Sequence, residues 1–151
     1  MKALEIKVFD SHNIWFNLFM FKTKKEMVNR IKKDYSDANV NKNTSGYFRP
    51  TSHMVSDEAP GRFTSNIIGA MYINIEEADE EIVAHECGHA TFNYEHYLRR
   101  YNGKFNSDDT SNDEWYFNGG SYEQEAFCYF LGIAYKKAWQ AIKLYKRELK
   151  A

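Results

Sequence analysis

Five consecutive residues, His85-Glu86-Cys87-Gly88-His89, form the pattern His-Glu-x-x-His. Four residues advance an α-helix by slightly more than one turn, so both imidazoles project from one face and can take two corners of a zinc tetrahedron. Glu86 is offset by one position, so its carboxylate is a poor ligand but can reach a water beside the metal. The spacing therefore predicts a zinc site on His85 and His89, with Glu86 as general base.

A catalytic zinc normally takes three protein ligands and keeps a fourth position open, so a third ligand must be found. The downstream candidates are Glu95, His96, Glu114, Glu123 and Glu125. His96 would lie roughly 10 Å beyond His89 along a helix axis, too far to share one ion. A motif extended by a third histidine would need glycine at position 92 and histidine at position 95, but Phe92 and Glu95 occupy these positions.

Helical phase separates Glu123 from Glu125, because each residue turns a helix by about 100°. The positions in phase with Glu123 are apolar: Phe127, Phe130, Ala134, Ala138 and Ala141. The positions in phase with Glu125 are mostly polar: Tyr129, Gly132, Lys136, Lys143 and Arg147. A carboxylate at the head of a buried stripe is costly unless it is paired or binds a metal. We therefore expect Glu123 to be the third zinc ligand, with Glu125 as the alternative.

The segments around the motif predict an α+β fold with a small sheet. Leu4, Ile6 and Val8 alternate with polar residues, which indicates a strand, and the apolar segment 13–21 predicts a second strand paired with it across a turn at 10–13. Residues 47–55 predict a third strand broken by Pro50. Residues 67–75 predict a fourth strand that leads directly into the helix of the zinc motif.

Helices are expected over three segments: 23–34, 79–99 and 121–149. Thr23 and Ser121 each begin a capping box, and Asp79 is a suitable N-cap followed by acidic residues. Loops are expected over 36–46, 57–65 and 101–120. The sequence contains no internal repeat, so we expect a single domain over residues 1–151.

Composition favours a compact protein and argues against two classes of partner. The 151 residues are 43% hydrophobic and carry a net charge of −1, so no global field favours nucleic acid or a membrane surface. No run approaches the roughly 18 apolar residues that cross a bilayer. The basic stretch 136–150 has helical spacing and predicts a solvated outer face. The two cysteines, Cys87 and Cys128, suit a reducing compartment, so we expect a cytoplasmic protein.

The pattern His85-Glu86-x-x-His89, followed by Glu123-x-x-Ala126 on a second helix, resembles the gluzincin branch of zincin-like metallopeptidases. In particular it is similar to small proteins of the ImmA/IrrE kind and to related phage and prophage proteins. The resemblance covers residues 67–134 and implies a zincin-like fold, in which a small mixed sheet packs on the motif helix and a long C-terminal helix carries the third ligand. The chain departs from the family at Phe127, where Asn or Asp is frequent.

The resemblance implies a zinc peptidase that acts on a protein or peptide substrate. Zinc would activate a water and polarise the scissile carbonyl, while Glu86 would take the proton of the water and pass it to the leaving amine. The strand 67–75, as the counterpart of the zincin edge strand, could hold an extended peptide by strand addition. An oxyanion donor could come from Tyr101, Tyr116, Tyr122 or an arginine.

Two other classes of function are open to the same sequence. A zincin-fold binding protein, such as a phage-encoded antagonist of a host protein, would act by occupying its partner. Glu86 favours the enzyme, because a pure binder has no use for a general base. A structural zinc site would need four ligands. Cys87 points about 160° away from the two histidines around a helix, so we expect it to pack in the core.

Overall fold

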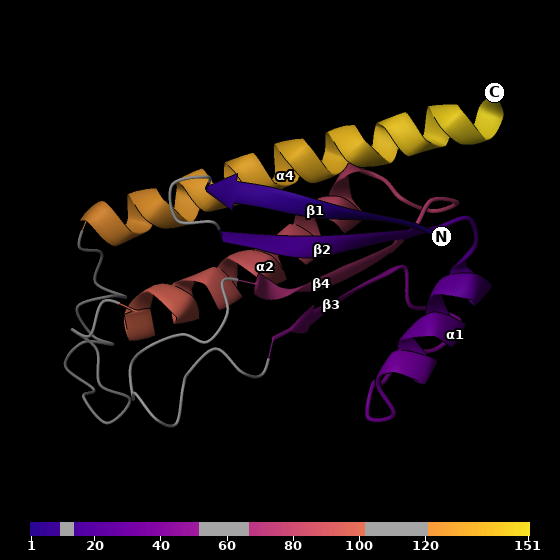
Figure 1. Ribbon diagram of the computed structural model, residues 1–151, viewed down its shortest axis with the longest axis horizontal. Helices are drawn as coiled ribbons and strands as arrows, with labels where there is room; N and C mark the ends of the chain where they lie inside the picture. The colour runs from indigo at the N-terminus through magenta and orange to yellow at the C-terminus, as the bar shows by residue number, and fades with distance from the viewer. Residues whose placement is uncertain (10–13, 52–66, 102–120) are drawn as a thin grey trace.

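The structure is a computed structural model that describes residues 1–9, 14–51, 67–101 and 121–151, with the backbone alone at 96–101 and 121–126. The described residues form a four-stranded mixed sheet and three helices (Figure 1), so the expected α+β class is confirmed. The elements in chain order are β1 (Lys2–Phe9), β2 (Ile14–Phe21), α1 (Lys24–Asp34), β3 (Gly46–Pro50), β4 (Ile67–Asn74), α2 (Glu80–Tyr101) and α4 (Ser121–Lys150).

The first two strands form the expected hairpin. β1 and β2 pair antiparallel, with Leu4 opposite Leu18 and Ile6 opposite Phe16. Alternate residues of β2 are buried, as a strand with one face on a core requires. The predicted turn at 10–13 lies outside the described residues.

The fourth strand lies inside the sheet, and this corrects the expectation that it serves as an open edge for a peptide. The strand order is β1-β2-β4-β3, with β4 parallel to β2 and antiparallel to β3. Residues 68–74 are all buried. A strand covered on both faces is a continuous apolar run rather than an alternating one, and the segment Ile67–Asn74 has that pattern.

The edge nearest to β4 is formed by β3, beyond which the described residues contain no further strand. The Thr51 amide donates to the Ile68 carbonyl at 2.9 Å. Every second residue of β3, counted back from Thr51, therefore has its backbone groups directed to β4. Antiparallel backbone groups alternate in direction, so the N–H and C=O groups of Gly46 and Phe48 point to the open edge. Pro50 has the same outward phase, where its missing N–H removes no bond to β4. β3 covers Gly46–Pro50, and residues 52–55 of the predicted strand lie outside the described residues.

The helix starts follow the predicted caps. The Thr23 hydroxyl accepts from the Glu26 amide at 3.2 Å, and α1 ends at Asp34 as expected. The Asp79 carboxylate accepts from the Ile82 amide at 2.9 Å at the start of α2. The cap predicted at Ser121 involves side chains outside the described set.

Helices α2 and α4 cover one face of the sheet, and α1 packs against the other side (Figure 1). The middle of the stripe predicted on α4 is confirmed, since Phe130, Ala134 and Ala138 are fully buried, while Phe127 and Ala141 are half-buried. Phe130 stacks on Tyr94 of α2, with ring centroids 4.4 Å apart. The packing of α2 on α4 thus closes the main core.

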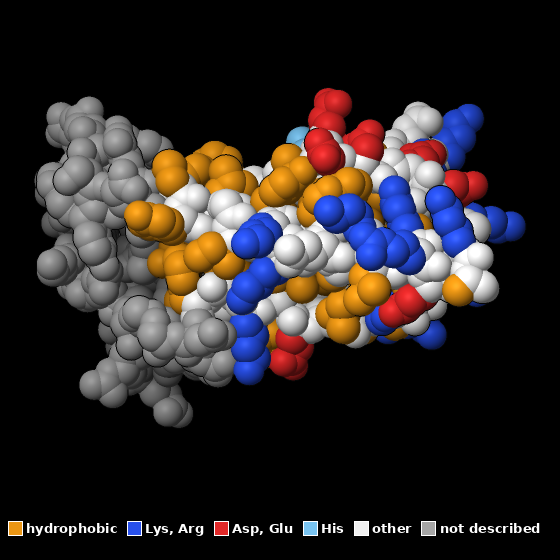
Figure 2. All heavy atoms as spheres, turned by 90° about the horizontal axis from the view of Figure 1, so that it is seen from above, with side chains coloured by type: hydrophobic (Ala, Val, Ile, Leu, Met, Phe, Trp, Pro, Cys, Tyr) orange, Lys and Arg blue, Asp and Glu red, His pale blue; other side chains and the backbone are white. Residues whose placement is uncertain are grey.

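The outer face of α4 is basic, as the sequence predicts. Lys136, Lys143 and Arg147 are exposed, and Figure 2 shows Lys and Arg side chains gathered over this face. The two ends of the described chain meet near it, where Lys2 pairs with Glu148 at 2.6 Å. None of the described helices is long and apolar enough to cross a membrane.

Ile142→Ala tests whether the C-terminal half of α4 belongs to the cooperative core. Ile142 is fully buried, so its truncation should lower the free energy of unfolding by about 2–5 kcal/mol. Leu144, which is 52% exposed on the same helix, provides the matched control. Leu144→Ala should change the free energy of unfolding by less than about 0.5 kcal/mol. Urea denaturation followed by circular dichroism measures both. Equal effects would show that this half of α4 is not docked as described.

Candidate metal and catalytic site

The apolar stripe of α2 fixes the rotation of the motif helix. Val83, Cys87 and Ala90 are fully buried and face the core. His85 and His89 lie on the other side of the helix and are exposed. The core packing of α2 therefore presents both imidazoles away from the core, and Cys87 is a core residue as predicted.

The two imidazoles converge on one point. His85 Nε2 and His89 Nε2 are 3.2 Å apart, and the ring planes meet at 79°. Two nitrogens that each bind a tetrahedral zinc at 2.0–2.1 Å are roughly 3.3 Å apart, so the pair fits two positions of a zinc coordination sphere. Burial and the neighbouring His85 ring lower the pKa of His89, which favours the neutral imidazole that binds metal.

The third ligand cannot be read from the described side chains, which contain no group of three His, Cys, Asp or Glu residues that could hold a metal. His96, Glu114, Glu123 and Glu125 have side chains outside the described set, as do the candidate oxyanion donors Tyr101, Tyr116 and Tyr122. The rings of Phe127 and Phe92 lie 5.8 Å apart, so the turn of α4 around Phe127 lies beside the part of α2 that follows His89. Glu123, one turn before Phe127, stays a prediction.

The Glu86 carboxylate is buried with no partner among the described residues. Its exposed fraction is 5%, and it makes no hydrogen bond or ion pair with any described side chain or backbone group. Burial raises the pKa of Glu86 to about 7. A carboxyl group with such a pKa can both take and give a proton near neutral pH, which is the property required of a general base that later acts as an acid.

Gly46, the first residue of β3, covers the Glu86 side chain. A Cβ at position 46 would lie 3.0 Å from both Cγ and Oε1 of Glu86, closer than ordinary van der Waals contact. The absence of a side chain at this position therefore lets the start of the edge strand lie directly on the carboxylate. The two groups come from distant parts of the sequence and meet only in the folded chain.

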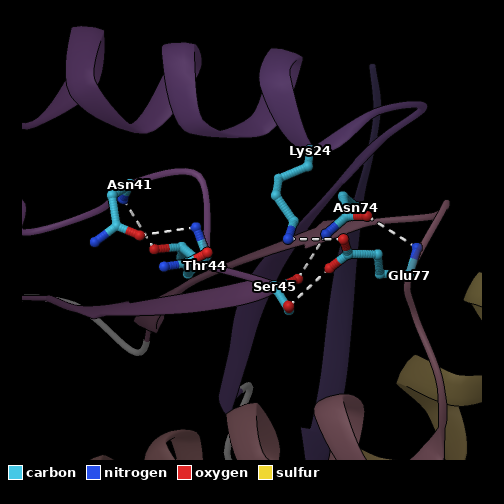
Figure 3. Close-up of polar contacts among 7 residues, drawn as sticks. Lys24, Asn41, Thr44, Ser45, Asn74 and Glu77 are labelled. Atoms are coloured by element: carbon cyan, nitrogen blue, oxygen red, sulfur yellow. Dashed lines mark hydrogen bonds and ion pairs between the residues drawn. The ribbon is translucent and has the colours of Figure 1, made fainter.

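A network of polar contacts holds the segment before β3 in this place (Figure 3). Asn74 is fully buried and donates to the Ser45 carbonyl at 2.8 Å, while its own carbonyl oxygen accepts from the Glu77 amide at 2.9 Å. The Ser45 hydroxyl donates to Glu77 at 2.7 Å, and Lys24 pairs with the other oxygen of Glu77 at 2.7 Å. The end of β4, the start of α1 and the start of β3 are thereby joined beside Glu86.

A pocket of about 220 Å³ opens between these elements. Its lining residues are Ser45, Gly46, Glu81, Ile82, His85 and Glu86. The first turns of α2 and the segment entering β3 form its walls, so the pocket adjoins both His85 and the buried carboxylate.

Cys87 does not favour a structural zinc site. Its side chain is fully buried, and burial raises the pKa of the thiol to about 12, with a smaller contribution from Glu86. Zinc binds the thiolate, which this environment disfavours.

Sequence reasoning identified His85, Glu86 and His89 but missed the groups that surround Glu86. The missed residues are Ser45, Gly46, Asn74, Glu77 and Glu81. A weak signal was present at Asn74, because a polar residue that interrupts an apolar strand must find hydrogen bonds if it is buried. Gly46 carried no signal, since its Ser-Gly sequence is also typical of a loop.

Comparisons of the chain with family models, with curated proteins and with solved structures give no match. The interpretation of the site rests on the residues described above.

Gly46→Ala tests the contact with Glu86. The added methyl group would displace the carboxylate or the strand, so we expect a loss of about 1–3 kcal/mol in the free energy of unfolding. Gly132 of α4 is the control, because a Cβ there meets nothing within 4 Å. Gly132→Ala should leave stability unchanged or raise it by up to about 1 kcal/mol. Both free energies of unfolding are measured by denaturant titration. A change of the same sign in both variants would contradict the close approach at Gly46.

Glu77→Gln tests the network by its pH dependence. The hydrogen bond with Lys24, and then that with Ser45, holds the pKa of Glu77 below its ordinary value of 4.5. Such a group adds stability above the unfolded pKa and loses it as the pH falls through the folded pKa. Wild-type stability should therefore decline as the pH drops below about 4.5, and the decline should be shallower in Glu77→Gln.

Urea midpoints measured from pH 7 to pH 3 give this comparison. Glu76→Gln is the matched control, because Glu76 has no hydrogen bond or ion pair with a described residue and should keep the wild-type slope. A Glu77→Gln protein whose slope equals that of wild type would show that the network does not form.

Proposed function

We propose that this chain is a zinc-dependent peptidase with a zincin-like fold, which hydrolyses peptide bonds in a protein or peptide substrate. The observation that carries the proposal is the pair of imidazole nitrogens 3.2 Å apart, together with a buried carboxylate on the same helix that has no partner among the described residues. The mixed sheet packed against α2 and α4 supports the fold assignment. We further propose a cytoplasmic location, which the free cysteines Cys87 and Cys128 support.

His85 and His89 would hold the metal, with Glu123 as the third ligand. Bound zinc would supply a Lewis acid that lowers the pKa of a water and polarises a carbonyl. Glu86 would take the proton released by the attacking water and deliver it to the leaving amine. Its burial beneath Gly46 suits this role, because a carboxylate kept from bulk solvent has its pKa near neutrality.

The open edge of β3 is where an extended substrate would bind, in place of the strand 67–75. Gly46 and Phe48 direct backbone groups to this edge, which allows pairing with a peptide backbone. Pro50 lacks an N–H on the same side, so pairing would be limited to the start of the strand. Because Gly46 also lies on Glu86, a peptide paired there would run past the general base.

A binding protein that keeps the fold without hydrolysis remains the second candidate, since the open edge of β3 could equally pair with a partner protein. The buried Glu86 favours the enzyme. A carboxylate buried without a partner is costly, and a binder that used only the edge strand would gain nothing from it.

Metal content tests the first step of the proposal. Purified wild-type protein should hold about one zinc per chain by elemental analysis, and His85→Ala should lose it. Glu123→Ala should also lose the metal, while Glu125→Ala should keep it. If Glu123→Ala keeps its zinc and Glu125→Ala loses it, Glu125 would be the third ligand in place of Glu123. A wild-type chain that neither holds nor takes up zinc would contradict the peptidase.

Hydrolysis tests the second step, with fluorescein-labelled casein as the probe. Glu86→Gln should keep the zinc content of wild type and lower the rate by about 10²–10⁴-fold, because it removes the general base. Zinc-loaded wild type without any hydrolysis of casein or of a mixed peptide library, but with retained binding, would favour the binding protein.

A further inference from the structure

We propose that the pocket between the first turns of α2 and the start of β3 is a subsite for a cationic nitrogen of the substrate peptide, with Glu81 as its specificity-determining residue. This inference rests on the proposed function, because it assigns a substrate class to the same site. The pocket has a volume of about 220 Å³ and is open to solvent on one side. It can therefore admit a long side chain.

The position of Glu81 follows from the helix. Glu81 precedes His85 by four residues, so the two side chains lie on one face of α2, and both line the pocket. Ile82 adds an apolar wall, against which the methylene groups of a lysine or arginine can pack while the charged end reaches a carboxylate. The arrangement combines an apolar surface with an anionic group.

Two carboxylates in this pocket have no cationic partner among the described side chains. The ion pairs of the described residues involve other acids, namely Glu148 with Lys2, Glu77 with Lys24, Asp34 with Arg30 and Asp37 with Arg49. Glu81 and Glu86 belong to none of these pairs. Glu86 in addition is 5% exposed, lines the pocket and makes no hydrogen bond with a described residue. A cation in the cavity would stabilise the ionised form of such a buried, unpaired carboxyl group.

The surroundings add to the negative potential. The segment that leads into α2 contains Glu76, Glu77, Asp79, Glu80 and Glu81, of which Glu77 is paired with Lys24, and Lys146 donates to the Ala78 carbonyl between them. The hydroxyl of Ser45 donates its proton to Glu77, so its oxygen is left to accept a hydrogen bond at the pocket wall.

A cationic nitrogen can come from two sources in a peptide, the side chain of lysine or arginine and the free α-amino group. Both present N–H donors and a positive charge, so both match Glu81. The test therefore uses peptides in which the two sources are separated.

The experiment measures binding to the zinc-loaded wild-type chain by fluorescence anisotropy, and cleavage of the same samples by mass spectrometry. The probes are labelled peptides of equal length with one variable position, namely acetylated Lys, acetylated norleucine, acetylated Glu and norleucine with a free N-terminus. We expect the acetylated Lys peptide to bind about fivefold more tightly than the acetylated norleucine peptide, as for a partly exposed ion pair. If the subsite takes the α-amine instead, the free norleucine peptide will show that gain.

Two matched variants assign the preference to Glu81. In Glu81→Gln, the ratio of the affinity for the acetylated Lys peptide to that for the acetylated norleucine peptide should fall to about one. Glu80→Gln should keep the wild-type ratio of affinities. Glu80 lies next in the chain but acts on Tyr135 of α4, where it contributes to the raised pKa of that phenol. Equal losses in both variants would mean a diffuse acidic field rather than a subsite and would overturn the proposal. So would a wild-type chain without preference for either cationic peptide.

The binding measurement tests the subsite and the cleavage measurement tests the proposed peptidase function, so the two hypotheses can fail independently. Cleavage without a cationic preference would refute the subsite and leave the proposed function intact. A preference that depends on Glu81, without cleavage of any peptide, would support the subsite and refute the peptidase.

Discussion

The Glu86 carboxylate is buried without a described partner, and such a group is costly in a folded protein. The rest of the fold has to maintain that burial. The apolar stripe of α2 turns the helix so that Glu86 faces the start of β3, and Gly46 allows the strand to approach within van der Waals distance. The network of Asn74, Ser45 and Glu77 then holds the strand in place. The candidate site is therefore a consequence of how three elements meet.

The same arrangement links Glu86, the proposed general base, to the strand edge where we propose that a peptide binds. The strand that covers Glu86 is also the edge of the sheet, so the residue that buries the carboxylate belongs to the backbone that a substrate would pair with. A displacement of β3 would change both the environment of Glu86 and the position of the peptide. This coupling gives a structural reason for a polar network at a place where the sheet itself needs none.

Charge is divided between two faces of the molecule. The outer face of α4 is basic, while the entry to α2 is acidic and adjoins the pocket beside His85. The overall charge of −1 conceals this separation. A substrate or partner would therefore meet a local field near the site that the net charge does not reveal.

The sequence by itself determined the features that depend on local order. The hairpin strands follow from alternation and apolar runs, and the helix starts follow from Thr23 and Asp79, because a cap bonds to residues two or three positions away. The facing pair His85 and His89 follows from the helical repeat, and the solvated and buried faces of α4 follow from its phase.

Only the tertiary structure decided which strand is the edge, what covers Glu86 and which acid shares its pocket. The position of β4 between β2 and β3 depends on pairing between strands that are distant in the sequence. Its continuous apolar run suits a central strand, because both faces of such a strand are covered. Gly46 lies against Glu86 because of where β3 joins the sheet. The physical reason is that local patterns specify periodicity and caps, whereas pairing and burial depend on contacts between residues that are distant in the sequence.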